Sequence, residues 1–311
     1  MQKMINLPHL ANQVFGAPLY ATRDLVDAVK SVLIPRIMGS GERGIDGITV
    51  SMETEKSSEA TQQSAGSGSA IAVIPVHGIL VPRRGQINAD CQELTSYEGL
   101  RNQLQRALDN PTIMEVVFDI NSSGGIASGC KELADFIFAS REIKPITAIV
   151  NFSAFSAAYF IASACSKVVV SQTSGVGSIG VIMEHLDASG WEAMNGIKFT
   201  SIYCGDNKDL FSPHAPLCDE DKAIIQAIVN DSYTLFTSSV AQYRGMVVQA
   251  VIDTQAALYF GNNAITAGLA DEMCSPQEAI NAIAGKYTSA TTSGHQRIQL
   301  RAAAMAKQVS M

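Results

Sequence analysis

From residue 71 onward, short apolar runs alternate with helical patterns, and this alternation constrains the fold more than any other feature of the chain. The runs "IAVIPVHGIL", "MEVVFDI", "ITAIVN" and "KVVVS" are typical of strands, with Pro75 expected to break the first. Helical patterns lie between them, one opening with Thr95 at capping-box spacing from Glu98. Nearly all-apolar strands are buried on both faces, as in parallel sheets. The pattern predicts an α/β domain with a parallel β-α-β core and, after residue 219, a mainly helical C-terminal part.

Composition divides the chain into four parts. Residues 1–50 form an N-terminal preamble in which "TRDLVDAVKSVLIPRIM" has helical spacing, limited or kinked at Pro35. Residues 51–70, "SMETEKSSEATQQSAGSGSA", carry almost no large apolar side chain, so we expect a flexible linker. Residues 71–284 form the folded domain, and residues 285–311 a mobile tail.

Overall composition excludes several classes of protein. The chain has 311 residues, of which 47% are hydrophobic and 16% charged, enough for a sizeable core. The net charge of −7 and the lack of a long basic run argue against a nucleic-acid partner. No apolar run is long enough to span a membrane, and the N-terminus does not resemble a signal peptide. Six widely spaced cysteines without C-x-x-C favour reduced thiols in a cytoplasmic protein over disulfides or a metal site.

A glycine pair follows the second strand. The stretch "DINSSGG" (119–125) leads from a buried strand into a helix, and Gly124 and Gly125 leave their backbone N–H groups free of side-chain cover. Such N–H groups beside a helix N-terminus suit a developing negative charge. A plain glycine turn between strand and helix explains the same residues, and taken alone it is the commoner case.

Ser156 lies just after "ITAIVN", at the same edge of the predicted sheet as the glycine pair. Sites in α/β sheets gather at the carboxyl ends of strands. A serine there can present its hydroxyl, and the N–H of Ala157 could help to bind an oxyanion. The alternative is a helix-capping or core serine, which is the usual fate of a single serine.

A serine nucleophile needs a base, and the sequence leaves its identity open. None of the five histidines has a specific relation to Ser156. Lys208 lies in the loop "YCGDNKDLFSPHAPL", and a lysine withdrawn from water can act as a base. Its position between two aspartates favours a solvated surface lysine instead. Ser178, in "TSGVGSIGVIMEHLD", could support the lysine, line a cleft or serve turn geometry.

Four motifs occur in order along the chain: "SSGG", "FSAAYFIAS", "GVGSIGVI" and "GDNKDLFSP". Together they resemble the signal peptide peptidase A family of serine–lysine peptidases, a branch of the Clp/crotonase-like fold. The segment "LYFGNNAITAGLADEM" (258–273) resembles the end segment of that family, so the resemblance covers about residues 70–284. Each motif is weak alone, and the ordered set is specific.

The resemblance implies a serine–lysine dyad and an oxyanion hole of three backbone N–H groups, carried by Ser156, Lys208, Gly124, Gly125 and Ala157. Ser178, from its glycine-rich loop, could support this dyad, and the resemblance calls for no metal or cofactor. Family members often have glycines directly after the serine, where this chain has two alanines. We therefore expect an oxyanion hole with tighter geometry.

The preamble "NLPHLANQVFGAPLY" (6–20) is similar to the start of the phage capsid-assembly proteases of the minor capsid protein C type. That group implies a soluble serine endopeptidase that acts inside the assembling prohead, in the host-cell cytoplasm. Its expected substrates are scaffold protein, portal protein or the protease itself. The family also implies a homo-oligomer, with no nucleic-acid or membrane partner.

Three alternatives stay open. The first is a bacterial cytosolic peptidase that degrades signal peptides or serves protein quality control. The second is an acyl-CoA hydratase-type enzyme of the same fold, which would direct the glycine N–H groups at a thioester oxygen. The third is a non-catalytic capsid-assembly component, which would tolerate replacement of Ser156 or Lys208.

Overall fold

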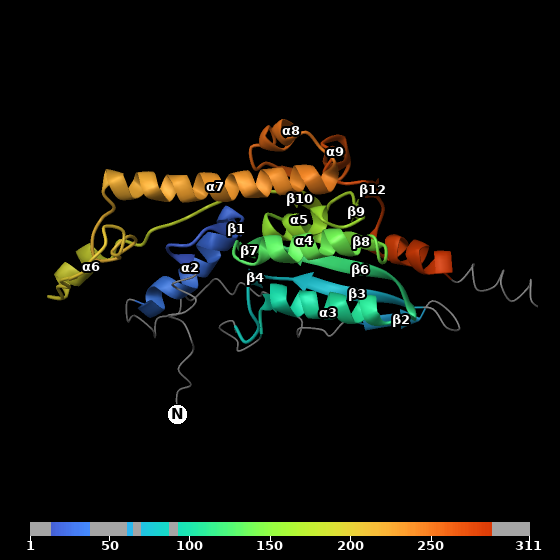
Figure 1. Ribbon diagram of the computed structural model, residues 1–311, viewed down its shortest axis with the longest axis horizontal. Coiled ribbons are helices and arrows are strands. Elements are labelled where there is room, and N and C mark those ends of the chain that lie inside the picture. Colours follow the sequence, from blue (N-terminus) through green and yellow to red (C-terminus); the bar gives the residue numbers. More distant parts are fainter. Residues whose placement is uncertain (1–13, 38–60, 65–69, 87–92, 288–311) are drawn as a thin grey trace, which may run out of the picture.

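The computed structural model describes residues 14–37, 61–64, 70–86 and 93–287, which form an elongated α/β structure (Figure 1). The strands are β1 (Leu19–Ala21), β2 (Thr61–Ser64), β3 (Ala70–His77), β4 (Leu80–Val81), β5 (Thr95–Ser96), β6 (Ile113–Ser122), β7 (Gly124–Ile126), β8 (Ile146–Phe155), β9 (Lys167–Val170), β10 (Gly175–Gly177), β11 (Leu258–Phe260) and β12 (Glu272–Met273). The helices are α2 (Arg23–Ile37), α3 (Tyr97–Asp109), α4 (Cys130–Ser140), α5 (Ala157–Ser163), α6 (Ser189–Met194), α7 (Asp219–Arg244), α8 (Val248–Ile252) and α9 (Asn262–Thr266).

A large sheet of order β11-β10-β8-β6-β3-β2 forms the centre, and β9 joins its strand β8. The pairs that join β3, β6, β8, β9 and β10 are parallel, and the outer strands β2 and β11 are antiparallel. Val116 and Phe118 of β6 face the larger core, beneath α3, α4, α5 and α7. Val117 faces a smaller core that a helix over residues 276–287 covers. The predicted α/β class, with its parallel core and mainly helical C-terminal part, is confirmed.

A second, four-stranded sheet of order β1-β7-β4-β5 lies at the carboxyl end of the large one. Its strand β7 contains the glycine pair, and its edge strand β1 comes from the preamble. Residues 14–37 therefore pack on the domain, with Leu19 and Val26 buried. The helix predicted in the preamble is α2, which contains Pro35.

Two local expectations differ from the structure, at Pro75 and at the start of α3. Of the predicted linker, residues 51–70, the structure describes 61–64, which form β2 and pair antiparallel with β3 through backbone groups, and residue 70, while 51–60 and 65–69 lie outside the described residues. Pro75 does not break β3, because the pairing of β3 with β6 continues through Pro75, opposite Asp119, to His77. The N-cap of α3 is Ser96, whose Oγ accepts from the Gly99 N–H at 3.1 Å. Residues 288–311 of the predicted tail lie outside the described residues.

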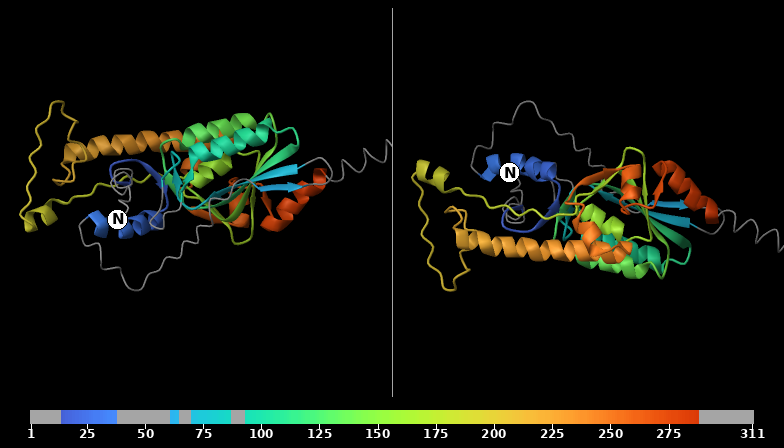
Figure 2. Two further views of the ribbon diagram at one scale, coloured as in Figure 1. Left: turned by 90° about the horizontal axis from the view of Figure 1, so that it is seen from below. Right: turned by 90° about the horizontal axis from the view of Figure 1, so that it is seen from above.

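The first half of α7 and α6 extend away from the rest of the molecule (Figures 1 and 2). All buried residues of α7 come from its second half, beginning at Phe236. The segment 195–218 joins α6 to the free end of α7 and is largely exposed. We call α6, this segment and the first half of α7 the arm.

Within the described ranges, no helix is long and apolar enough to cross a bilayer. The five cysteines that the structure describes are free thiols, and Cys130 and Cys165 are buried. Burial raises the pKa of both thiols.

An ion pair fixes the inner end of α7 to the edge of the large sheet. The guanidinium of Arg244, only 8% exposed, contacts Asp271 through two bonds of 2.6 and 2.9 Å. Asp271 also accepts from the Val168 N–H at 2.7 Å. Burial opposes ionisation of Asp271, but the Arg244 guanidinium and the Val168 N–H outweigh it and hold the pKa of the carboxyl below its usual range.

Replacing Asp271 with Asn should lower the free energy of unfolding by about 2 kcal/mol at pH 7, because Arg244 loses its charged partner. The lowered pKa stabilises the fold above about pH 4, where unfolded carboxylates are ionised, and this contribution fades as the pH falls through the folded pKa. Urea unfolding should therefore show a large difference in the free energy of unfolding between wild type and Asp271→Asn at pH 7, and a small difference at pH 3. Asp231→Asn is the control. It changes an exposed residue on α7, the helix that carries Arg244, and should have no measurable effect at either pH.

Candidate active site

Ser156 occupies the junction between β8 and α5 in an unusual backbone conformation. Its φ of 55° and ψ of −116° lie in a region that non-glycine residues rarely adopt, at a typical cost of about 1–3 kcal/mol. The junction is held from both sides: the Ser156 N–H donates to the Gly177 carbonyl at 2.8 Å, and the Ser156 carbonyl accepts from the Phe160 N–H at 2.9 Å. The strand–helix turn thus places the serine at the carboxyl edge of the sheet.

The Ser156 hydroxyl has no hydrogen-bond partner among the described residues, although Ser156 is completely buried. Its side chain does not cap α5. A buried hydroxyl without a partner costs about 1–3 kcal/mol, so neither the capping nor the core-serine alternative explains the residue. Ser163, the buried serine of α5 itself, differs because its Oγ donates to the Phe160 carbonyl at 2.8 Å.

The glycine pair lies directly beside Ser156. A Cβ on Gly124 would stand 3.1 Å from the Ser156 Cβ and 2.1 Å from the Tyr20 carbonyl oxygen. Gly124 also has a φ of +102°, which favours glycine. A Cβ on Gly125 would stand 2.0 Å from the Leu80 carbonyl oxygen. Close backbone approach therefore requires glycine at both positions. The Gly124 N–H donates to the Ser122 hydroxyl at 3.1 Å, and an incoming oxygen would compete with that bond.

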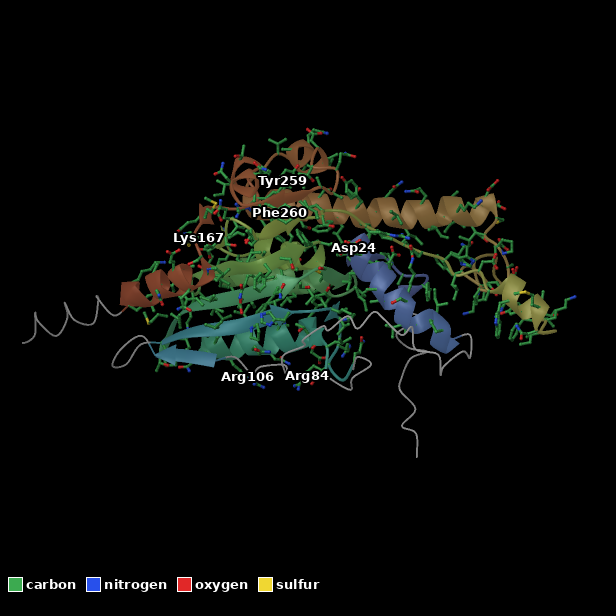
Figure 3. The ribbon with its side chains drawn as sticks, turned by 180° about the vertical axis from the view of Figure 1, so that it is seen from behind. Asp24, Arg84, Arg106, Lys167, Tyr259 and Phe260 are labelled. Carbon is green, nitrogen blue, oxygen red and sulfur yellow. The ribbon has the colours of Figure 1, made fainter. Side chains whose placement is uncertain are left out.

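Strand β10 supports the junction from the other side. Gly177 has a φ of +113°, and a Cβ there would stand 2.5 Å from the Ala257 carbonyl oxygen. A Cβ on Gly175 would meet the rings of Phe155 and Phe260 at 2.8 and 2.6 Å. Figure 3 shows Phe260 beside Tyr259 on β11, next to this edge of the sheet.

Ala157 and Ser178 also lie at this junction. Ala157 is the first residue of α5 and is fully buried. Ser178 follows the carbonyl that holds the Ser156 N–H, has a φ of 54°, and lines a cavity of about 420 Å³. The cavity lies between Ala21, the segment 178–182 and α7. Space for a further side chain therefore exists one residue away from the contact to Ser156.

A strand from the preamble covers the glycine pair. In the antiparallel pairing of β1 with β7, Tyr20 stands opposite Gly125 and Ala21 opposite Gly124. The sequence analysis missed this contact, because three residues after Pro18 are too few to show a strand period. The one signal in the sequence was Pro18 directly before a short apolar run, because proline within sheets is confined to the starts and edges of strands.

Lys208 does not lie beside Ser156 within one chain. It is exposed on the arm, and its side chain has no ion pair among the described residues. Helix α5 packs on the second half of α7, where the rings of Phe160 and Phe236 stack with centroids 4.6 Å apart. Phe236 is about 25 Å along α7 from its first residue, at a rise of about 1.5 Å per residue. The segment 195–218 lies at that far end (Figures 1 and 2).

The described histidines have other partners. His77 contacts Asp119 at 3.1 Å, and His214 contacts Glu192 at 2.7 Å. His185 Nε2 is 3.2 Å from the Ala215 carbonyl oxygen. Among the residues that the structure describes, no cluster of three or more histidine, cysteine or acidic side chains could hold a metal ion.

Comparison with known proteins gives one family and several relatives. Residues 139–288 match the model of peptidase family S49. The chain is 34% identical to capsid assembly protease C of Escherichia phage lambda over 291 residues, covering 88% of this chain and 65% of that protein. It is 39% identical to head-tail preconnector protein GP5 of Enterobacteria phage P21 over 224 residues, covering 72% of this chain and 44% of that protein. The chain thus spans less than two thirds of the length of either phage protein.

A bacterial relative and a solved structure also match. The chain is 28% identical to a putative signal peptide peptidase SppA of Enterococcus faecium, covering 75% of this chain and 69% of that protein. Among solved structures, a ClpP1 mutant from Listeria monocytogenes is similar, with a TM-score of 0.37 and 15% identity. That match covers 66% of this chain and 92% of the other.

The geometry of Ser156 predicts that its replacement stabilises the protein. Ser156→Ala removes a buried hydroxyl that has no partner among the residues described, so the free energy of unfolding should rise by about 1 kcal/mol. Ser156→Gly should raise it at least as much, because glycine adopts the observed φ without strain. Urea unfolding measures both.

Ser163→Ala, in the helix that follows Ser156, is the matched control. It removes a hydroxyl that does have a partner and should lower the free energy of unfolding by about 1 kcal/mol. A fall of similar size for Ser156→Ala would show that the Ser156 hydroxyl contributes to stability like any core serine.

Proposed function

Because residues 139–288 are a peptidase family S49 domain, the family resemblance predicted from the sequence is confirmed, and we propose that this chain is a serine endopeptidase with Ser156 as its nucleophile. The observation that carries the proposal is the buried Ser156 hydroxyl, which has no hydrogen-bond partner in the described part of the chain and is held in a strained conformation beside Gly124. Strain and unsatisfied polar groups concentrate at functional sites.

The proposed reaction is acyl transfer. The Ser156 hydroxyl attacks a peptide carbonyl while its proton passes to a base, and the resulting oxyanion is stabilised by the N–H groups of Gly124, Gly125 and Ala157. The protonated base then gives its proton to the leaving amine, and water releases the acyl group. Because Ala157 and its neighbour Ala158 are fully buried, the helix N-terminus that supplies one N–H is rigidly packed.

We assign the base to Lys208, delivered by a neighbouring copy of the chain. Lys208 belongs to the exposed segment 195–218, which joins the outer end of α7, whereas Ser156 precedes α5, which packs on the inner half of α7. We therefore infer that its own Ser156 is out of reach. The cavity beside Ser178 leaves room for an incoming side chain next to the Ser156 junction. A lysine amine enclosed by protein loses its proton more readily than one in water, as a general base for a serine requires.

The surface of the arm supports assembly into a homo-oligomer. Several of its large apolar side chains are exposed, up to 96% for Ile202, and the others are Met194, Ile197, Phe199 and Tyr203. Exposed apolar groups gathered on one projecting segment are typical of an interaction surface. The first half of α7 buries none of its residues within the chain and is available for the same contact.

The biological setting that we propose is the assembling prohead in the host-cell cytoplasm. The two phage relatives include a capsid assembly protease, and their matches extend over most of this chain. Scaffold protein, portal protein and the chain itself are the proposed substrates. The match to a putative signal peptide peptidase favours one second candidate, a bacterial peptidase that degrades signal peptides or misfolded proteins.

Replacement of the dyad should abolish cleavage. Purified Ser156→Ala and Lys208→Ala proteins should lose at least about a thousandfold in the rate of cleaving co-expressed capsid proteins or an unfolded protein. Lys198→Ala, an exposed lysine change on the same arm, is the matched control and should keep the wild-type rate. Full activity of Lys208→Ala would show that the base is another residue, and inactivity of the wild type would favour a non-catalytic assembly component.

Mixing the two inactive variants should restore activity. If the base comes from a neighbouring copy, a chain with Lys208→Ala still offers Ser156, and a neighbour with Ser156→Ala still offers Lys208. Refolded together in equal amounts, they should recover about a quarter of the wild-type rate, the share expected from random pairing of neighbours. A mixture as inactive as its components would place the dyad within one chain.

A further inference from the structure

Strand β1 is bonded on both of its edges at the candidate nucleophile. On one edge it pairs antiparallel with β7, with Leu19 opposite Ile126. On the other edge, the Leu19 N–H donates to the Ile182 carbonyl at 2.8 Å, and the Leu19 carbonyl accepts from the Ile182 N–H at 3.1 Å. Upstream, the Gly16 N–H donates to the Glu184 carbonyl at 2.9 Å. An extended peptide added between two strand edges makes contacts of this kind.

The Tyr20 carbonyl of this strand and the Ser156 side chain meet over the same glycine. The Tyr20 oxygen lies 2.1 Å, and the Ser156 Cβ 3.1 Å, from the position that a Cβ on Gly124 would take. In acyl transfer, the carbonyl that is attacked has to stand between the nucleophile and the backbone N–H groups. The Tyr20 carbonyl and the Ser156 side chain therefore crowd the same side of Gly124, one of the proposed oxyanion-hole residues.

The side chains of β1 occupy two contrasting environments. The Tyr20 ring is 2% exposed and lies against Phe160 and Phe236, with centroids 5.7 and 4.6 Å away. Its hydroxyl donates to the Ser232 carbonyl at 3.0 Å, and burial raises the pKa of Tyr20 to about 12. Ala21, beside the cavity, is small and belongs to a separate apolar cluster. One position thus takes a large aromatic ring with a polar tip, and the next a small side chain.

We infer that the place of β1 is the substrate-binding strand of the proposed peptidase, and that residues 15–21 fill it in the free chain. The substrate is an extended peptide that places a large aromatic side chain where Tyr20 lies and a small one where Ala21 lies. Cleavage then occurs between these two residues. This inference rests on the proposed peptidase function, and it adds the mode of binding and the substrate class.

A clamp between α2 and the segment after β10 holds β1 in place. Arg23 and Lys30 of α2 contact the two carboxylate oxygens of Glu184 at 2.5 and 2.8 Å. The same two side chains contact Asp27 within the helix. Figure 3 shows the inner end of α2, marked by Asp24, below α7. A substrate can enter only when β1 leaves, so the free chain is inhibited by its own segment.

A reversible disulfide tests whether β1 must leave. Leu19 and Ile126 are Cα partners in the antiparallel pairing. The bonds from the Ala127 N–H to the Pro18 carbonyl and from the Thr22 N–H to the Ser123 carbonyl place them at a position without mutual hydrogen bonds. Cα atoms at such positions are about 4.5 Å apart, within the range that a disulfide spans. The full-length variant carries Leu19→Cys together with Ile126→Cys.

Two measurements report the effect of this disulfide, which we call the lock. The first is cleavage of an unfolded protein by the oxidised and the reduced form. The second is binding of a fluorescent peptide with the sequence of residues 14–23 to the same variant carrying Ser156→Ala, which needs no catalysis. We expect the oxidised form to lose at least about tenfold in both readouts and the reducing agent to restore them. Wild-type protein with and without reductant is the control.

Each outcome decides one question. Equal cleavage, or equal peptide binding, by the oxidised and reduced forms would overturn the inference, because β1 would then be a permanent strand. Absence of peptide binding to either form would overturn it as well. Peptide binding that follows the lock, with no cleavage by any form, would refute the peptidase function and leave a peptide-binding site at this position.

The substrate class and the clamp have their own tests. A peptide with glycine in place of the tyrosine should bind the reduced variant at least about tenfold more weakly, since the ring pocket stays empty, and equal binding would refute the aromatic preference. Glu184→Gln in the otherwise unchanged chain should raise the cleavage rate by loosening the clamp. Asp27 contacts the same two cations, but only within α2, so Asp27→Asn should leave the rate unchanged. Equal rates for both variants would overturn the role of the clamp.

Discussion

Close backbone packing around Gly124 is the constraint on which the rest of the site depends. Strands β1, β4 and β7 and the start of α5 approach one another so closely that a single Cβ on either glycine would collide with a carbonyl oxygen. This approach brings Ser156 to the end of β7, and the strained turn at Ser156 follows because β8 must pass directly into α5. The carbonyl of Gly177 then holds the turn in place. Glycines in β7 and β10 thus build the site by allowing backbone and side chains to approach closely.

Much of this arrangement could be predicted from the sequence. Continuous apolar runs indicate strands buried on both faces, and Val116 to Phe118 of β6 do divide between the two cores. The junction after "ITAIVN" and the turn "NSSGG" both end strands, so their meeting at one sheet edge follows from parallel topology. The ordered motifs gave the family, which the S49 match confirms. The catalytic roles of Ser156 and Lys208 stay predictions.

Other features could not be predicted, for identifiable physical reasons. The three residues of β1 carry no periodic signal. Tertiary contacts fix them instead: the Tyr20 ring packs against Phe160 and Phe236, and backbone bonds join the strand to two distant segments. Strand β2 is polar and depends on backbone pairing, which composition does not report. The separation of Lys208 from Ser156 depends on the length and direction of α7, whereas the sequence gives only the interval between the two residues.

The arm gives the chain a property of another kind. When nucleophile and base belong to different copies, an isolated molecule is chemically incomplete, and the concentration of active sites rises with about the square of the protein concentration while encounters are rare. Dilute protein in a large compartment would stay inactive, whereas the same number of molecules enclosed in a small shell would become active together. The timing of proteolysis would then be set by confinement, a geometric trigger that needs no separate activator.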